Sequence, residues 1–302
     1  MRRIGLLGVP SSAGARQKGQ EKGPRALRKA SLLEKMGTTG LDIHDFGDLP
    51  EVSYRPDSVN PRGQNLDLVV SVAKSVSDRV NGIVKEGFFP VVMGGDCTIT
   101  LGVLDGVIPN KPGLGLIYFD GDVDINTPDT TVSGIFDGMG LAHIIGKGTE
   151  PLTHLGTRYP LMPEKNVLLF GYNEEAGLMD AWEKETLSTC QMMEYPVEKI
   201  RGKPRESAGR AAGELASKVD SILLHFDVDV IDDDDFPVAD VPHPGGLTFD
   251  EAMEALSVFL SYQEVTGLVI TEFNANRDVQ GFQAGRLVEA VVNAFGTGTG
   301  NL

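Results

Sequence analysis

Six short apolar runs, spread along 302 residues, most constrain how this chain can fold. They are rich in Val, Ile and Leu, which is typical of strands buried on both faces. They span residues 4–9, 89–93, 114–119, 167–170, 222–226 and 265–270. Helix-like spacing of apolar residues fills the segments 24–36, 66–85, 174–187, 205–218, 249–261 and 277–294. This alternation predicts an α/β fold, with a parallel sheet covered by helices on both faces.

Composition narrows the function without identifying it. Gly and Pro are scattered, so we expect a single domain over residues 1–302, with a frayed tail at 296–302. A net charge of −16 argues against a nucleic-acid partner. The sequence has no apolar run long enough for a membrane span. Two cysteines, Cys97 and Cys190, do not form a disulfide framework, so we expect a reducing cytoplasm.

Acidic residues gather just after several of the predicted strands. In open parallel sheets, ligands bind outside the carboxyl ends of the strands. The residues at these positions are Asp96 and Cys97 after 89–93, Asp120, Asp122 and Asp124 after 114–119, Asp227 and Asp229 after 222–226, and Glu272 after 265–270. Four strand ends therefore bring at least six carboxylates and one thiol to one edge of the sheet.

This concentration of negative charge needs counter-ions. Two like charges about 4 Å apart repel by roughly 4 kcal/mol at an effective dielectric constant of about 20. Divalent cations are the simplest answer, and carboxylate oxygens suit Mg, Ca and Mn. A single aspartate can instead start a turn or cap a helix, and Cys97 can be a small buried hydrophobe. Two Asp-x-Asp motifs together with a cysteine favour a metal site.

At these residues the sequence resembles the arginase–agmatinase (ureohydrolase) family, over nearly the whole chain. Gly94-Gly-Asp-Cys97 resembles Gly-Gly-Asp-His, Asp120-Gly-Asp-Val-Asp124 resembles Asp-Ala-His-x-Asp, Ser133-Gly-Ile-Phe-Asp137 resembles Ser-Gly-x-x-His, and Asp227-Val-Asp229 resembles Asp-x-Asp. The resemblance implies a three-layer α/β/α sandwich around an eight-stranded parallel sheet. It also implies a homo-oligomer, either a trimer or a hexamer.

The same resemblance implies two divalent metal ions. One would be held by Cys97, Asp120, Asp124 and Asp227, and the other by Asp120, Asp122, Asp227 and Asp229. Manganese is the favoured ion because of the five aspartates, and a cysteine thiolate makes zinc the alternative. Asp124, Asp137 and Glu272 match positions with catalytic roles, and Glu272 matches the acid that anchors a guanidinium group.

The resemblance further implies a small-molecule guanidino substrate. Asn126, Thr131 and Ser133 match arginase residues that hold the α-carboxylate and α-amino end of the substrate. Asn173 falls roughly where arginases use an aspartate. We therefore expect a metal-dependent amidinohydrolase that acts on arginine or an arginine derivative and releases urea or hydroxyurea. Two alternatives are a catalytically impaired arginase-fold protein with a regulatory or structural role, and a hydrolase of another guanidine or formimino compound.

Three family histidines are absent together, replaced by Cys97, Asp122 and Asp137. The extra negative charge should hold cations well but make their bound water less acidic. Asp137, crowded by other acids, is expected to keep a proton at neutral pH and to serve as an acid. Of the remaining histidines, we expect His225 either to contact a metal ligand or to be a core residue, and His243 to lie in a surface loop.

Overall fold

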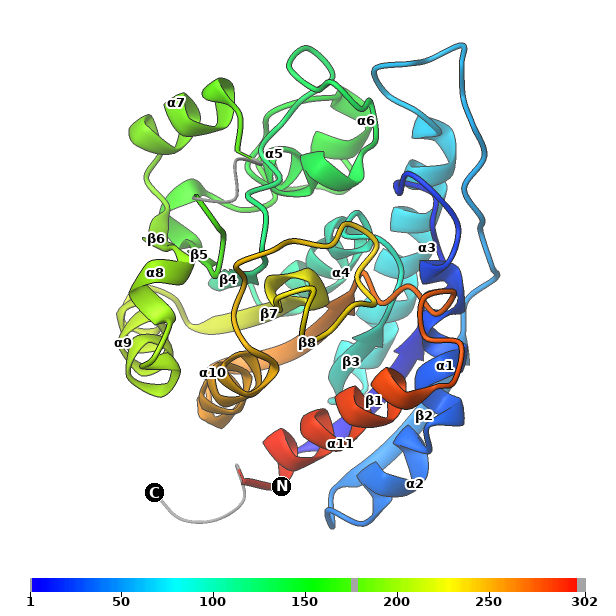
Figure 1. The fold of residues 1–302 in the computed structure, drawn as a ribbon, viewed down its shortest axis with the longest axis vertical. Helices are drawn as coiled ribbons and strands as arrows, with labels where there is room; N and C mark the ends of the chain where they lie inside the picture. The colour runs from blue at the N-terminus through cyan, green and yellow to red at the C-terminus, as the bar shows by residue number, and fades with distance from the viewer. Residues whose placement is uncertain (1, 175–178, 298–302) are drawn as a thin grey trace.

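The computed structural model describes residues 2–174 and 179–297, and its centre is one eight-stranded parallel sheet (Figure 1). The strands are β1 (Arg3–Gly8), β2 (Asp42–Asp48), β3 (Phe89–Met93), β4 (Leu114–Phe119), β5 (Val167–Phe170), β6 (Met193–Tyr195), β7 (Ser221–Asp227) and β8 (Val265–Thr271). Their order is β2-β1-β3-β8-β7-β4-β5-β6, and all neighbouring strands are parallel. The predicted fold class is confirmed.

Helices cover both faces of the sheet and make the predicted three layers (Figure 1). The helices are α1 (Gly23–Lys29), α2 (Leu32–Gly37), α3 (Leu66–Lys85), α4 (Ile99–Val107), α5 (Gly140–Ile144), α6 (Glu150–Thr153), α7 (Ala181–Thr189), α8 (Val197–Ile200), α9 (Pro204–Ala216), α10 (Phe249–Ser261) and α11 (Phe282–Thr297). One apolar core joins the sheet to α1, α2 and α8–α11, and the other joins it to α3–α7. Strand residues alternate between them: Ile117 and Phe119 pack in the first core, and Leu116 and Tyr118 in the second.

Several predicted element bounds differ from those observed. The helix predicted over 24–36 is two helices, because Ser31 between them takes a left-handed φ of 66°. The helix predicted over 174–187 begins only at Ala181, and residues 175–178 of that prediction lie outside the described part of the chain. Of the predicted tail, residues 298–302 also lie outside it, and α11 continues to Thr297.

The two strands that carry no apolar run, β2 and β6, are the outer strands of the sheet. β2 has the sequence DIHDFGD and its residues are half-buried or exposed, while β6 has three residues. Short and charged strands are typical of sheet edges, where they discourage pairing with other chains. An uninterrupted apolar run identifies only strands that are buried on both faces, so this pattern did not predict β2 or β6.

The sheet order places the four acid-bearing strand ends next to one another. β3, β8, β7 and β4 are consecutive in the sheet, with Phe119 paired to Phe226 and Phe226 paired to Ile270. The residues after these positions therefore meet at the carboxyl edge. Across the described residues, no helix combines the length and the apolar character required to cross a bilayer.

Candidate metal centre and cavity

The carboxyl ends of β4 and β7 supply a buried group of aspartates. Asp120 and Asp227 are almost completely buried, and Asp124 and Asp229 nearly so. Backbone amides hold two of them: the Asp122 N–H donates to Asp120 Oδ1 at 2.7 Å, and the Asp229 N–H donates to Asp227 Oδ1 at 2.8 Å. In each Asp-x-Asp motif, the amide of the second aspartate thus holds Oδ1 of the first aspartate. The Oδ2 atom of the first aspartate remains available to other groups.

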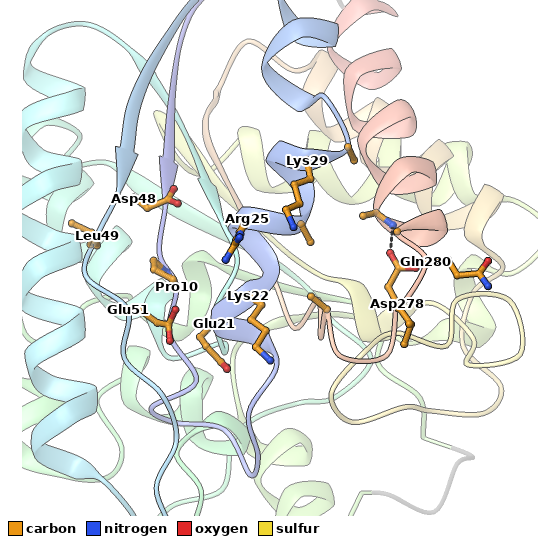
Figure 2. Close-up of a pocket in the computed structure, with 16 residues that line it drawn as sticks. Pro10, Glu21, Lys22, Arg25, Lys29, Asp48, Leu49, Glu51, Asp278 and Gln280 are labelled. Atoms are coloured by element: carbon orange, nitrogen blue, oxygen red, sulfur yellow. Dashed lines mark hydrogen bonds between the residues drawn. The ribbon is translucent and has the colours of Figure 1, made fainter.

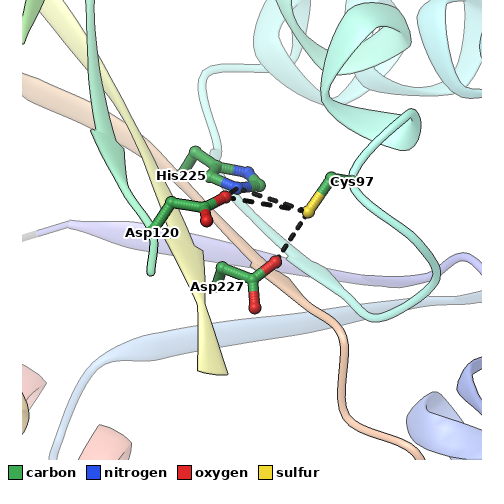
Figure 3. A group of neighbouring side chains, drawn as sticks. All are labelled: Cys97, Asp120, His225 and Asp227. Atoms are coloured by element: carbon green, nitrogen blue, oxygen red, sulfur yellow. Dashed lines mark hydrogen bonds and ion pairs between the residues drawn. The ribbon is translucent and has the colours of Figure 1, made fainter. Parts of the chain in front are cut away.

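One donor cluster combines Cys97, Asp120, His225 and Asp227, whose ligand atoms lie within 4.8 Å of one another (Figure 3). Cys97 Sγ donates to Asp227 Oδ2 at 2.6 Å and lies 3.7 Å from His225 Nε2. His225 Nε2 is also 3.3 Å from Asp120 Oδ2. The His225 ring stacks on Tyr118, and its Nδ1 is 2.8 Å from Thr100 Oγ1, so the other nitrogen is fixed toward the cluster. His225 is thus fully buried and lies against two of the predicted metal ligands, Cys97 and Asp120.

A second cluster combines Asp122, Asp229 and His243. His243 Nε2 lies 2.9 Å from Asp122 Oδ2 and 3.5 Å from Asp229 Oδ2. The expectation that His243 lies in a surface loop is wrong, since only 1% of it is exposed. Backbone bonds fold its loop inward: the Asp233 N–H donates to the His243 carbonyl, and the Gly245 N–H donates to Asp232 Oδ2 at 2.6 Å.

Burial and crowding shift the proton affinities of these groups. Burial, together with repulsion from neighbouring carboxylates, raises the pKa of Asp120, Asp124 and Asp227 well above the ordinary range. Burial also raises the pKa of the Cys97 thiol. Burial would lower the pKa of His243, but its bonds to Asp122 and Asp229 outweigh this effect and raise it to about 11. The carboxylates therefore require protons or cations nearby.

The residues fit a binuclear divalent-cation site. Carboxylate oxygens are the donors that Mn²⁺ prefers, and the two clusters lie at the same strand edge. In the described part of the chain, His243 Nδ1 and Glu272 Oε1 are buried polar atoms without a hydrogen-bond partner. Such orphaned atoms are rare in folded proteins and indicate groups awaiting a ligand, an ion or water.

A cavity of about 480 Å³ is lined by Cys97 of the first cluster and by all three residues of the second, whereas Asp120, His225 and Asp227 do not line it. Most predicted site residues line it: Cys97, Asp122, Asp124, Asn126, Thr131, Ser133, Asp137, Asp229 and Glu272. Glu272 is almost fully buried, and its Oε2 accepts a hydrogen bond from Gln20 Nε2 at 3.1 Å. Asp124 and Glu272 have left-handed φ angles of 48° and 64°, which non-glycine residues adopt at a cost. Strained backbone of this kind tends to occur at functional sites.

Asp137 faces the same cavity from the segment that precedes α5. It is buried, and its Oδ1 accepts a hydrogen bond from the Cys97 N–H at 2.8 Å. Burial and repulsion from Asp96 raise the pKa of Asp137 well above its ordinary value. This direction agrees with the expectation that Asp137 keeps its proton at neutral pH.

Asn126, Thr131, Ser133 and Glu183 form a polar wall of the cavity, and the sequence patterns missed Glu183. Asn126 Nδ2 donates to Glu183 Oε1 at 2.8 Å, and the Thr131 and Ser133 hydroxyls lie 3.2 Å apart. Burial raises the pKa of Glu183 to about 7. The capping box that Glu183 forms with Asp180 at the start of α7 is the only sequence signal that singles it out.

Asn173 has a different position from the other predicted substrate residues. It is not among the residues that line the cavity. Its Nδ2 donates to the carbonyls of Pro244 and Gly245, at 3.1 and 2.8 Å. Asn173 thus helps to hold the loop that carries His243.

A larger pocket, of about 850 Å³, lies elsewhere, between α1 and the segments that flank β2 and α11 (Figure 2). Its charged lining is mixed and contains Lys22, Arg25 and Lys29 together with Glu21, Asp48, Glu51 and Asp278. None of the donor clusters found among the described residues belongs to this pocket. Size alone therefore does not identify the reactive site.

The raised pKa values predict how the stability of metal-free protein depends on pH. Above pH 6.5 the unfolded chain releases the His243 proton, whereas the folded chain keeps it until about pH 11. Because the folded state then binds more protons, its free energy of unfolding falls as pH rises. We expect a fall of about 1.4 kcal/mol per pH unit from His243 alone between about pH 7.5 and 10. Urea denaturation of chelator-treated protein measures it.

The matched variant is His243→Gln. Its free energy of unfolding should fall less steeply with pH, by about 1.4 kcal/mol per pH unit, because it lacks the one proton that His243 keeps. His225 and His143 do not interfere, because their pKa values are lowered by burial to about 3 and about 4. They therefore change stability only below the ordinary histidine range. A variant with the wild-type slope would contradict a protonated His243 in the metal-free fold.

Comparison with known proteins agrees with this geometry. A model of the arginase family matches residues 2–296. The arginase of Bacillus caldovelox is 30% identical, covering 98% of this chain and 99% of the relative. Human arginase-1 is 31% identical, covering 90% and 85%. The crystal structure of the Bacillus caldovelox enzyme superposes with a TM-score of 0.90 over 98% of this chain and 99% of that one.

Proposed function

Because this chain belongs to the arginase family, we propose that it hydrolyses the guanidinium C–N bond of arginine or an arginine derivative, releasing urea or hydroxyurea. One observation carries the proposal. Glu272 has a buried, unpartnered carboxylate oxygen and lines the same cavity as Cys97 of the first donor cluster and all three residues of the second. A buried anion needs a cationic partner, and a planar guanidinium offers paired donors to a carboxylate.

The arginase family is a family of binuclear metal enzymes, and candidate ligand groups are present here. We propose two divalent ions, with manganese favoured by the five aspartates and zinc the alternative favoured by Cys97. Cys97, Asp120, Asp124 and Asp227 would hold one ion. Asp120, Asp122, Asp227 and Asp229 would hold the other. The ions, when bound, lower the pKa of a water molecule so that it becomes a nucleophile at neutral pH.

The remaining chemistry belongs to side chains of the chain itself. Glu272 orients the guanidinium group so that its carbon faces the aspartates. The Tyr118 hydroxyl donates to Asp124 Oδ2 at 2.6 Å, and the Thr271 hydroxyl donates to Asp227 Oδ2 at 3.0 Å, which fixes both carboxylates. Asp137 holds a proton at the edge of the cavity for the amine that leaves.

The polar wall supports an α-amino acid substrate. The Thr131 and Ser133 hydroxyls and the Asn126 amide are suited to an α-carboxylate. Glu183, in contact with Asn126, is suited to the α-ammonium group once ionised. This arrangement favours arginine over a guanidine that lacks the carboxylate.

The first prediction concerns Glu272 and the metals together. Elemental mass spectrometry of manganese-treated protein should give about two ions per chain, and the loaded protein should release urea from arginine. Glu272→Gln should keep the metals but lose about 100-fold or more in kcat/KM, because the guanidinium loses its buried anion. Glu254→Gln, an exposed residue of α10, is the matched control. Failure to take up manganese or zinc would refute the proposal and favour the impaired arginase-fold alternative.

A second prediction tests Asp137 as the proton donor. Asp137→Asn should lower kcat and remove the alkaline limb of its pH profile, because an amide has no proton to lose. Asp137→His, which restores the family residue, should recover activity, with the alkaline limb of the pH profile at a different pH. The profile is measured by urea release from metal-loaded protein. An unchanged profile in Asp137→Asn would remove Asp137 from the reaction.

A third prediction tests Glu183 as the α-ammonium site. Because its pKa is raised to about 7, KM for arginine should fall as pH rises from about 6 to 8. Glu183→Gln should raise KM about tenfold and flatten this dependence. The exposed neighbour Glu185→Gln is the control. An analogue of arginine without the α-amino group should be insensitive to Glu183→Gln, and an equal loss for both substrates would contradict the assignment.

A further inference from the structure

Two of the three donor clusters in the described residues each contain one histidine that the arginase-like motifs do not contain; the third, Cys97, Asp137 and Glu272, contains none. His225 is the fifth residue of β7, and His243 lies in the loop between β7 and α10. The motifs instead place Cys97 and Asp122 where the family has histidine. The chain has therefore lost one imidazole near each proposed ion and has one other imidazole near each.

We propose that His225 Nε2 ligates the ion at Cys97 and Asp227, and that His243 Nε2 ligates the ion at Asp122 and Asp229. This inference rests on the proposed binuclear site and extends it. It assigns to each ion a nitrogen donor from a new position in the sequence. The ligand set that follows from the motifs alone contains only oxygen and sulfur.

The spacing of the donor atoms supports this assignment. Two ligands on one ion, each at about 2.1 Å, lie about 3.0–3.4 Å apart at octahedral or tetrahedral angles. His243 Nε2 is 2.9 and 3.5 Å from Asp122 and Asp229 oxygens. His225 Nε2 is 3.3 Å from Asp120 Oδ2 and 3.7 Å from Cys97 Sγ. The separation from Asp120 lies within this range and the two separations of His243 lie within about 0.1 Å of it. The 3.7 Å separation involves a sulfur ligand, whose longer bond of about 2.3 Å widens the edge.

The support around His225 is also that of a metal ligand. A ligating histidine usually bonds through its other ring nitrogen, which fixes the tautomer and the ring plane. His225 Nδ1 lies 2.8 Å from Thr100 Oγ1, and its ring stacks on Tyr118 at 4.2 Å between centroids. The buried ring cannot turn away from the cluster without breaking both contacts.

Hydrogen bonds also hold the loop that carries His243 in place. Asn173 donates to the carbonyls of the next two residues of the loop, and the Gly245 N–H donates to Asp232 Oδ2. These bonds hold an otherwise irregular Pro-His-Pro segment against the aspartates. The imidazole is buried with Nε2 directed to Asp122, and Nδ1 has no partner in the described residues. Nε2, rather than the unpartnered Nδ1, therefore faces the two aspartates that would hold an ion at this position.

Pulsed electron paramagnetic resonance of the Mn²⁺-loaded protein tests the proposal directly. Directly bound imidazole gives ¹⁴N couplings to Mn²⁺, which a shell of oxygen and sulfur does not. We expect ¹⁴N couplings in wild type, a reduced set in His225→Gln and in His243→Gln, and none in the double variant. His44→Gln, in the outer strand β2 and outside the donor clusters, should match wild type. Thermal unfolding of each variant shows whether it is folded.

The outcomes separate this inference from the proposed function. Two bound Mn²⁺ ions without ¹⁴N coupling would overturn the inference while leaving the metal site intact. A spectrum unchanged in either single variant would remove that histidine from the shell. Absence of bound Mn²⁺ would overturn both the proposed function and the inference. If a variant does not fold, the absence of ¹⁴N coupling in the wild-type spectrum still overturns the inference.

Discussion

The rest of the site depends on negative charge buried at the carboxyl edge of four adjacent parallel strands. In-register pairing sets Asp227 beside Thr271 and brings Asp120 to the end of the neighbouring strand β4. Backbone amides and hydroxyls satisfy several oxygens, but they do not offset so many clustered carboxylates in a low-dielectric setting. The clustered acids therefore need protons or cations, and the choice between the two links folding to metal binding.

The same constraint shapes the backbone that surrounds the edge. Asp124 and Glu272 take left-handed conformations that place their carboxylates over the cavity. Contacts compensate for the cost: Tyr118 holds Asp124, and the Glu272 N–H donates to the Gly95 carbonyl at 3.0 Å. Gly95 has a φ of 140°, and a Cβ there would lie 3.0 Å from the Val9 carbonyl oxygen. The turn after β3 thus needs glycine for both conformation and space.

Much of this arrangement could be predicted from the sequence because it follows from local patterns. Inner strands such as β4 are uninterrupted apolar runs, and acids that follow such strands must meet at one edge. The edge strands β2 and β6 escaped prediction because half-exposed strands have no such run. His243 escaped because its burial depends on bonds from Asn173 and Asp232, which only the folded loop brings together. Glu183 escaped because α7 reaches Asn126 only through tertiary packing.

Motifs compare ligands by position, whereas an ion responds to the donor atoms around it. By position, this chain replaces two neutral imidazoles with a thiol and a carboxylate, which adds negative charge. In the folded structure, His225 places one imidazole in the Cys97 cluster and His243 places one in the Asp122 cluster, and the added negative charge remains. The shell would then be richer in donors and more negative than the family pattern. Tight cation binding and a less acidic bound water are the expected consequences, because the same charge that attracts a cation weakens its pull on water.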